Sequence, residues 1–123
     1  MQSLPWFARS VFTVADVEAS LRFYVDQLGF TSPWSYKENG KIQIAQVERD
    51  GCALILASNL ERIGKGRVFV STNLEPESQI AALDVFRAEI EARGVAVKAG
   101  RWGYRLLVVT DPDGNELLFN YPA

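Results

Sequence analysis

The segment VADVEASLRFYVDQLGF at residues 14–30 decides the fold, because its landmarks return in the second half of the chain. Gly29, which follows the helical pattern of this segment, is matched by Gly94 after a second helical pattern. The turn Asp50-Gly51 is likewise matched by Asp113-Gly114. The matched positions lie about 64 residues apart, which indicates that one supersecondary unit is used twice. We therefore expect two similar modules in one pseudo-symmetric domain.

Each module reads as a strand, a helix and three further strands. In the first module, residues 6–57, the N-cap Asp16 starts a helix that ends at Gly29, and the predicted strands cover 7–14, 30–36, 41–47 and 52–57. In the second module, residues 66–121, the helix begins at Pro76 and ends at Gly94, and the predicted strands cover 67–71, 95–98, 104–110 and 116–121. Two helices against mostly antiparallel strands define an α+β fold. Its curved mixed sheet is expected to have the helices on the convex face and an open concave cup.

The composition is that of one globular domain over residues 1–123, with 48% hydrophobic and 23% charged residues. The net charge of −2 does not suit a phosphate-binding surface, so nucleic acid is not an expected partner. No apolar run approaches the roughly 18 residues of a membrane span. The first residues do not read as an export signal. We expect a cytoplasmic protein with no membrane partner.

The chain contains no histidine, the side chain most used to bind metals and to transfer protons near neutral pH. Its one cysteine, Cys52, lies in the apolar run CALIL at 52–56, which is typical of a buried thiol and not of a nucleophile. No cofactor is expected.

Residues 14–30, together with the segment TDPDGNELL at 110–118, resemble the vicinal oxygen chelate superfamily, also called the glyoxalase and bleomycin-resistance fold. Domains of this superfamily are built from paired βαβββ units, and the resemblance covers nearly the whole chain. It implies the fold and leaves the function open, because metal-dependent lyases, dioxygenases and binding proteins share that fold.

Metal enzymes of this superfamily usually place histidine or glutamate on the strands that line the cup. The resemblance puts Arg9, Ile55, Arg67 and Leu118 at those places. None of these side chains can ligate a divalent cation, since arginine is a permanent cation and the aliphatic chains have no lone pair. We expect no bound metal.

Because strand side chains alternate, the same alignment predicts which residues face the cup. The predicted ligand-binding residues are Arg9, Ile55, Arg67, Phe69, Glu116 and Leu118 from the strands, and Trp34, Tyr36, Trp102 and Tyr104 from the rim. An apolar cup with an aromatic rim and a few polar anchors is typical of small-molecule sites. Two alternatives remain open: the tryptophans pack in the core, or each arginine is neutralised by an acid such as Glu116.

Among the branches of the superfamily, the chain is most similar to the bleomycin-resistance proteins, which are dimers that bind a drug without chemistry. Trp34, four residues after Phe30, and the segment Arg101-Trp102-Gly103 carry this similarity. It implies a homodimer with ligand sites at the subunit interface, in which residues 1–14 are exchanged between subunits. Arg9 and Arg67 do not suit a strongly cationic drug. They favour an anionic, phenolic or polyketide-like aromatic ligand.

The sequence favours a protein that sequesters an aromatic or amphipathic natural product, conferring self-protection or antibiotic resistance. One alternative is a metal-independent lyase or isomerase with Glu116 as base and Arg9 or Arg67 as an electrostatic clamp. A regulatory ligand sensor or other noncatalytic subunit and a degenerate metal enzyme are the remaining alternatives. Recovery of an unchanged, stoichiometric ligand would separate binding from turnover.

Overall fold

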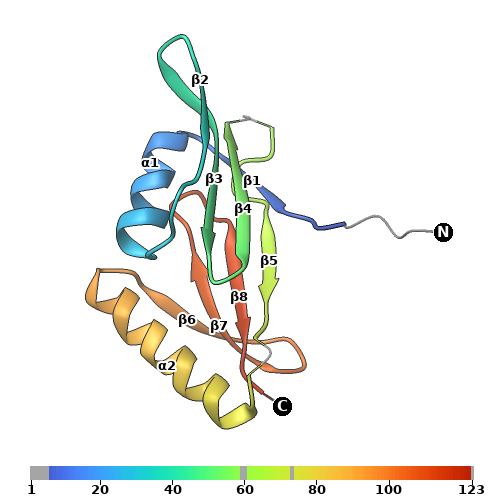
Figure 1. Ribbon diagram of the computed structural model, residues 1–123. Coiled ribbons are helices and arrows are strands. Elements are labelled where there is room, and N and C mark those ends of the chain that lie inside the picture. Colours follow the sequence, from blue (N-terminus) through green and yellow to red (C-terminus); the bar gives the residue numbers. More distant parts are fainter. Residues whose placement is uncertain (1–5, 59–60, 73, 123) are drawn as a thin grey trace, which may run out of the picture.

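The computed structural model describes residues 6–58, 61–72 and 74–122, and these form two modules of like topology (Figure 1). The first sheet has the order β1-β4-β3-β2 and consists of β1 (Ser10–Val14), β2 (Ser35–Glu38), β3 (Lys41–Arg49) and β4 (Cys52–Ser58). The second has the order β5-β8-β7-β6 and consists of β5 (Arg67–Val70), β6 (Val97–Arg101), β7 (Arg105–Thr110) and β8 (Glu116–Asn120). In each sheet the first pair is parallel and the others are antiparallel. The predicted α+β fold of two βαβββ modules is confirmed.

The first helix begins as predicted and then widens. The side chain of Asp16 accepts hydrogen bonds from the amides of Glu18 and Ala19 at 3.0 and 3.3 Å, which caps α1 (Val17–Leu21). The chain continues as a π-helical turn, η1 (Arg22–Gln27), in which the amide of Leu28 bonds to the carbonyl of Phe23. The wider turn was not predicted from the helical spacing.

The second helix, α2 (Pro76–Ala92), ends close to its predicted position. Gly29 and Gly94 follow the two helices with φ of 76° and 87°, a conformation in which glycine carries no side-chain penalty. Within the described ranges, no helix is both long enough and apolar enough to cross a membrane.

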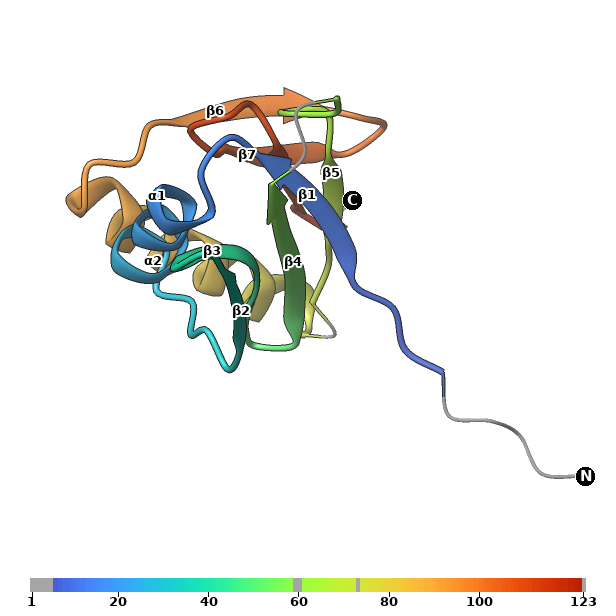
Figure 2. The same cartoon turned by 90° about the horizontal axis from the view of Figure 1, so that it is seen from above.

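Three strands start at least two residues later than predicted, and the bounds of the others differ by one or two residues. β1 starts at Ser10 instead of Phe7, and residues 6–9 extend away from the sheet (Figure 2). β2 starts at Ser35 instead of Phe30, because Pro33 has no amide hydrogen to donate to a ladder. β6 starts at Val97, since the amide of Val95 still bonds to the last turn of α2 at 3.0 Å.

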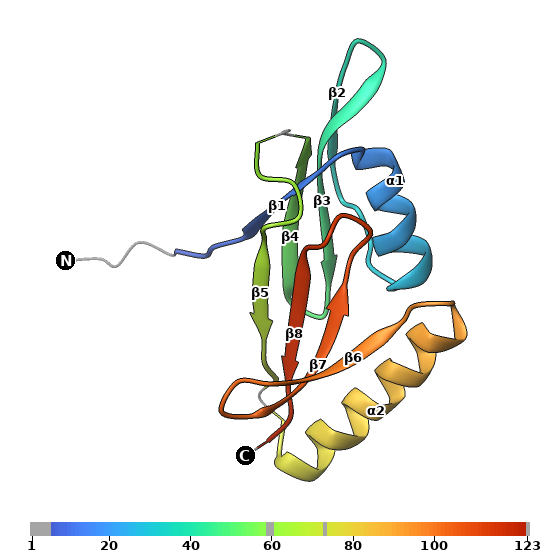
Figure 3. The same cartoon turned by 180° about the vertical axis from the view of Figure 1, so that it is seen from behind.

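The inner faces of both sheets pack into one core. Its fully buried members include Phe12, Val14, Leu54 and Leu56 from the first sheet and Val109 and Leu117 from the second. Both helices lie on one side of the molecule, and β1 and β5 run along the opposite edge (Figures 1 and 3). Because the inner faces share one core, the outer faces lie on the far sides of that core.

A buried polar network in the loop between β7 and β8 joins the two modules. Asp111, which is 4% exposed, accepts hydrogen bonds from the hydroxyl of Tyr24 at 3.1 Å and from the side chain of Asn115 at 3.0 Å. Asn115 also donates to the carbonyl of Thr13 at 3.1 Å and accepts from the amide of Gly66 at 2.8 Å. Burial, and then the charge of Asp111, raises the pKa of Tyr24, so its hydroxyl remains a donor.

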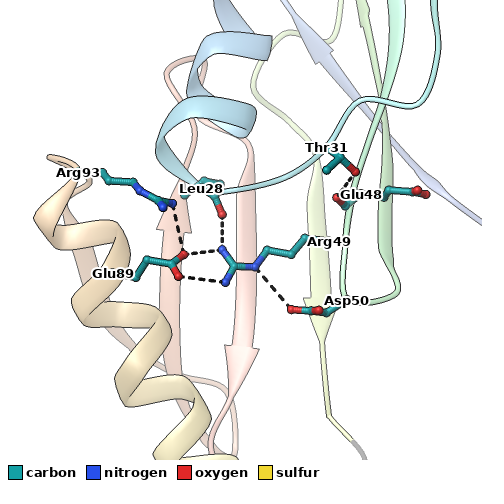
Figure 4. Close-up of polar contacts among 7 residues, drawn as sticks. All are labelled: Leu28, Thr31, Glu48, Arg49, Asp50, Glu89 and Arg93. Carbon is teal, nitrogen blue, oxygen red and sulfur yellow. Dashed lines mark hydrogen bonds and ion pairs between the residues drawn. The ribbon is translucent and has the colours of Figure 1, made fainter.

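An ion-pair cluster joins the end of β3 to α2 (Figure 4). Arg49 donates to the carboxylate of Glu89 at 2.6 and 3.3 Å and to the carbonyl of Leu28 at 2.6 Å. Arg93 approaches the same carboxylate at 3.4 Å, and the guanidinium of Arg49 lies 5.0 Å from the ring centre of Phe86. Hydrogen bonding to Arg49 holds the pKa of Glu89 below its ordinary value.

Replacing Glu89 with glutamine should lower the free energy of unfolding by about 1 kcal/mol at neutral pH, because it removes the charge from a partly exposed pair. A carboxylate with a depressed folded pKa stabilises the fold above its unfolded pKa and loses that contribution as the pH falls through the folded value. The difference between variant and parent should therefore shrink below about pH 4. Urea unfolding at pH 7 and pH 3 measures this, and a difference independent of pH would contradict it. Glu91→Gln, which breaks only a same-helix pair with Arg87, is the control.

Candidate ligand-binding site

The ten residues predicted to bind a ligand are divided between the outer faces of the two sheets, four on the first and six on the second. In the first sheet, Val11 pairs with Ile55 and Ile55 pairs with Gln46, so these side chains form a row facing away from the core. The second sheet pairs Arg67 with Glu116 and Phe69 with Leu118 in the same way. The first outer face is defined here as Arg9, Trp34, Tyr36, Gln46, Glu48 and Ile55. The second outer face is defined as Arg67, Phe69, Trp102, Tyr104, Glu116 and Leu118.

A hydrogen-bonded group orients the first outer face. The indole of Trp34 donates to the side-chain oxygen of Gln46 at 2.9 Å, and the guanidinium of Arg9 donates to the same oxygen. The amide of Gln46 donates to the carboxylate of Glu48 at 3.0 Å. Gln46 is 7% exposed, so it is a buried anchor between a cation and an indole. It was not predicted as a site residue, although a glutamine at an outward position of an apolar strand was a usable signal.

Arg67 is the polar centre of the second outer face. Its Nε donates to Glu116 at 3.1 Å, and its guanidinium carbon lies 5.7 Å from the ring centre of Trp102. Phe69 meets Trp102 nearly edge-on, with ring centres 5.4 Å apart. The floor of this face is apolar and comprises the buried side chains Leu106, Val108 and Leu118.

The four predicted rim aromatics are accessible. Trp34 and Tyr36 are 42% and 52% exposed, and Trp102 and Tyr104 are 45% exposed or more. The amide of Trp102 bonds to the carbonyl of Tyr104 at 2.9 Å around Gly103, which fixes the tip of the β6–β7 hairpin. None of these side chains belongs to the core of this chain.

The two predicted arginines have different partners. Arg67 forms an ion pair with Glu116, the acid named in one of the sequence-based alternatives. Arg9 instead bonds to the uncharged Gln46, and no carboxylate in the described part of the chain lies within ion-pair distance of it. Arg9 is therefore linked to the carboxylate of Glu48 only through Gln46, whereas Arg67 contacts its carboxylate directly.

One chain does not bring all ten predicted residues together. Arg9 and Trp34 lie on the first outer face, whereas Arg67 and Trp102 lie on the second, with the shared core between them. Each chain thus presents two separate outer faces, and a closed cup over either face requires a second surface opposite it.

An apolar cavity of about 440 Å³ lies elsewhere, between the β3–β4 turn and α2. None of the predicted site residues lines it, because it borders the inner side of β5 and β8, through Val70 and Phe119. The sequence feature that could have indicated this cavity is the apolar face of α2, which is widened by Ala81, Ala82 and Val85. Cys52 also lines this cavity, and burial raises the pKa of its thiol, which supports a structural role.

The residues present do not fit the metal that enzymes of related fold hold. Over the described ranges, no group of three or more histidine, cysteine, aspartate or glutamate side chains is placed to bind an ion. Ile55 and Leu118 have no donor atoms, and Arg67 is a cation bonded to Glu116.

A family model described as the glyoxalase/bleomycin resistance protein/dioxygenase superfamily matches residues 4–119, and the chain belongs to this superfamily. Among solved structures it is similar to the bleomycin-binding protein of bleomycin-producing Streptomyces verticillus, complexed with copper(II)-bleomycin. The two are 23% identical, the match covers 99% of this chain and 100% of that one, and the TM-score is 0.73.

Two further structures show that the fold carries more than one function. An antibiotic-binding protein from Streptomyces sp. CB03234 is 25% identical over 98% of this chain and 100% of its own, with a TM-score of 0.66. A lactoylglutathione lyase from Agrobacterium tumefaciens is 19% identical over 98% of this chain and 96% of its own, with a TM-score of 0.69. A search of curated proteins finds no match. The activity therefore has to be argued from the residues of the site.

Proposed function

We propose that the protein binds an aromatic or amphipathic small molecule and sequesters it unchanged, as a protein of antibiotic resistance or self-protection does. The observation that carries this proposal is the set of exposed aromatic side chains standing beside oriented polar groups on both outer faces. Aromatic platforms with a few fixed polar anchors are how small-molecule sites are built. The antibiotic-binding proteins among the structural neighbours support the same class of function.

The test is a screen by tryptophan fluorescence against aromatic antibiotics and aromatic acids, followed by mass spectrometry of whatever binds. A stoichiometric compound recovered unchanged supports sequestration. Catalytic conversion of a bound compound overturns it and favours the metal-independent enzyme with Glu116 as base. That alternative has one observation in its favour, the Glu116–Arg67 pair, which holds a carboxylate and a guanidinium together at 3.1 Å.

A homodimer is expected, because each chain presents two outer faces that are uncovered and an exposed arm. Trp6 and Phe7 are 85% and 80% exposed on the segment that leaves the fold in Figure 2. Exposed aromatics on an extended arm favour packing against a second copy. Residues 1–5 of the predicted exchanged segment lie outside the described residues.

Sedimentation of the protein should give twice the chain mass of 13.7 kDa. Replacing both Trp6 and Phe7 with serine should weaken the association without unfolding the module, since neither side chain is in the core. A monomer at every concentration tested would contradict the dimer.

No divalent metal should be bound in stoichiometric amount, because the four places where related enzymes carry ligands hold Arg9, Ile55, Arg67 and Leu118. Elemental analysis of the purified protein checks this directly. A chelator should leave the thermal midpoint unchanged, since no metal-binding free energy contributes to folding. One zinc, nickel, iron or manganese ion per chain would contradict the expectation.

A further inference from the structure

Building on the proposed ligand site, we infer that the second outer face selects an aromatic organic anion, with its ring against Trp102 and its carboxylate or phenolate on Arg67. The bleomycin-binding protein of similar fold is complexed with copper(II)-bleomycin. The fold alone therefore does not specify an aromatic anion, and the selectivity depends on the residues of this chain.

The guanidinium of Arg67 is held in place yet keeps free donors. Its Nε is bonded to Glu116 at 3.1 Å, while its terminal nitrogens make no hydrogen bond to any described residue. The side chain is 59% exposed, so those nitrogens are accessible from solvent. A guanidinium fixed by one edge presents its remaining N–H groups as a fork that matches a carboxylate.

Trp102 and Arg67 form one recognition unit. The guanidinium carbon lies 5.7 Å from the indole centre, Phe69 braces the same ring at 5.4 Å, and the indole remains 59% exposed. We expect a ligand ring that stacks on the exposed indole next to Arg67 to lie within reach of the free nitrogens of that guanidinium. A cationic ring would meet an indole whose π-electrons already interact with a cation, and would be repelled by that charge.

The other charges on this face also favour an anionic ligand. The strand register puts Lys98 in the row of Val108 and Leu118, so this side of the sheet carries Arg67 and Lys98 against the single carboxylate of Glu116. The whole chain has a net charge of −2. A cationic face on an acidic protein concentrates anions and disfavours cations at that face.

Three naphthalene probes of matched shape test the inference: 2-naphthoate, neutral 2-naphthamide and cationic 2-naphthylmethylammonium. Titration of the intact protein by calorimetry and tryptophan fluorescence should show the naphthoate binding about tenfold tighter than the amide, as expected for one charge-assisted hydrogen bond. The ammonium probe should bind weakest. The preference for the anion should shrink between 0.05 and 0.5 M salt, about the range over which such a charge interaction is screened.

Two variants with opposite expected effects on naphthoate affinity distinguish a change in binding from a loss of folding. Arg67→Gln should weaken naphthoate about tenfold and change the amide by less than about twofold. Glu116→Gln keeps an oxygen that can accept from Arg67 but removes the negative charge that competes with a bound anion, and it should tighten naphthoate by about threefold or more. Arg22→Gln, an equal charge change on the helix of the other module, should leave the order of the probes unchanged.

Failure of the inference and failure of the proposed function give different results. If all three probes bind equally, or the cation binds best, the inference is wrong and the ligand site stands. If the anion preference survives Arg67→Gln, Arg67 is not its source, and the inference is likewise wrong. If no probe and no antibiotic binds, both proposals fall together.

Discussion

Replacing Asp111 with alanine should lower the free energy of unfolding by about 3 to 5 kcal/mol, out of the roughly 5 to 15 kcal/mol that a whole domain has. The reason is the number of donors that depend on this one carboxylate. Asp111 accepts from the hydroxyl of Tyr24, from the amides of Asp113 and Asn115, and from the side chain of Asn115, all within 3.1 Å. Buried donors left without an acceptor each cost about 1 to 3 kcal/mol, and water cannot easily replace the lost oxygen at a site that is 4% exposed.

Asp113→Ala is the matched control, because it makes the same chemical change two residues away. Its carboxylate accepts from the exposed amide of Ala15 at 3.2 Å, so its loss should cost less than about 1 kcal/mol. Tyr24→Phe removes one member of the network and should fall between the two. Urea unfolding of the three variants measures these differences. Equal losses for Asp111→Ala and Asp113→Ala would show that the network does not hold the modules together.

Replacing Trp34 or Trp102 with alanine should weaken ligand binding by about 1 to 3 kcal/mol, as truncation of an aromatic anchor commonly does. The stability of the fold should change little, because the two side chains are 42% and 59% exposed. Phe12→Ala, at a side chain that is fully buried, should show the reverse pattern, with about 3 to 5 kcal/mol lost from folding. A melt and a titration on each variant separate the two outcomes.

Trp34→Phe refines this test. It keeps an aromatic platform but removes the indole donor to Gln46, so most of the affinity should remain if stacking is the main contribution. If Trp34→Ala and Trp102→Ala unfold the protein and leave the affinity of the remaining folded fraction unchanged, both tryptophans are structural and the proposed site is wrong.

The fold was predictable because its signals are local. The N-cap Asp16, the glycines at positions 29 and 94 and the Asp-Gly turns each act within a few residues, and together they set the order of helices and strands. Period-two alternation then separated the inner face from the outer one, which the register of Arg67 with Glu116 and Phe69 with Leu118 reproduces. The π-helical turn was missed, since it depends on how the segment meets the rest of the core. The late start of β2 was missed although Pro33 is a local signal for it.

The site was only partly predictable, because its arrangement is set by contacts between distant residues. Sequence reasoning predicted exposed aromatics, but it identified neither Gln46 as the hydrogen-bond partner of Trp34 nor the division of the residues between two faces. The partners of Arg9 and Arg67 also differ, although the two arginines occupy equivalent places in their modules. Which acid or amide a guanidinium finds is decided by the packing of neighbouring strands, which no local spacing encodes.

The network around Asp111 also bears on how such a protein can evolve. In the segment 110–118, Asp111 and Asn115 connect the two modules, whereas the side chains of Glu116 and Leu118 point outward and make no hydrogen bond to that network. Substitutions that change the ligand can therefore accumulate on the outer positions without loss of the fold. Because of this separation, the segment 110–118 identifies the fold of the chain but does not identify its ligand. Relatives that share this segment can therefore differ in what they bind.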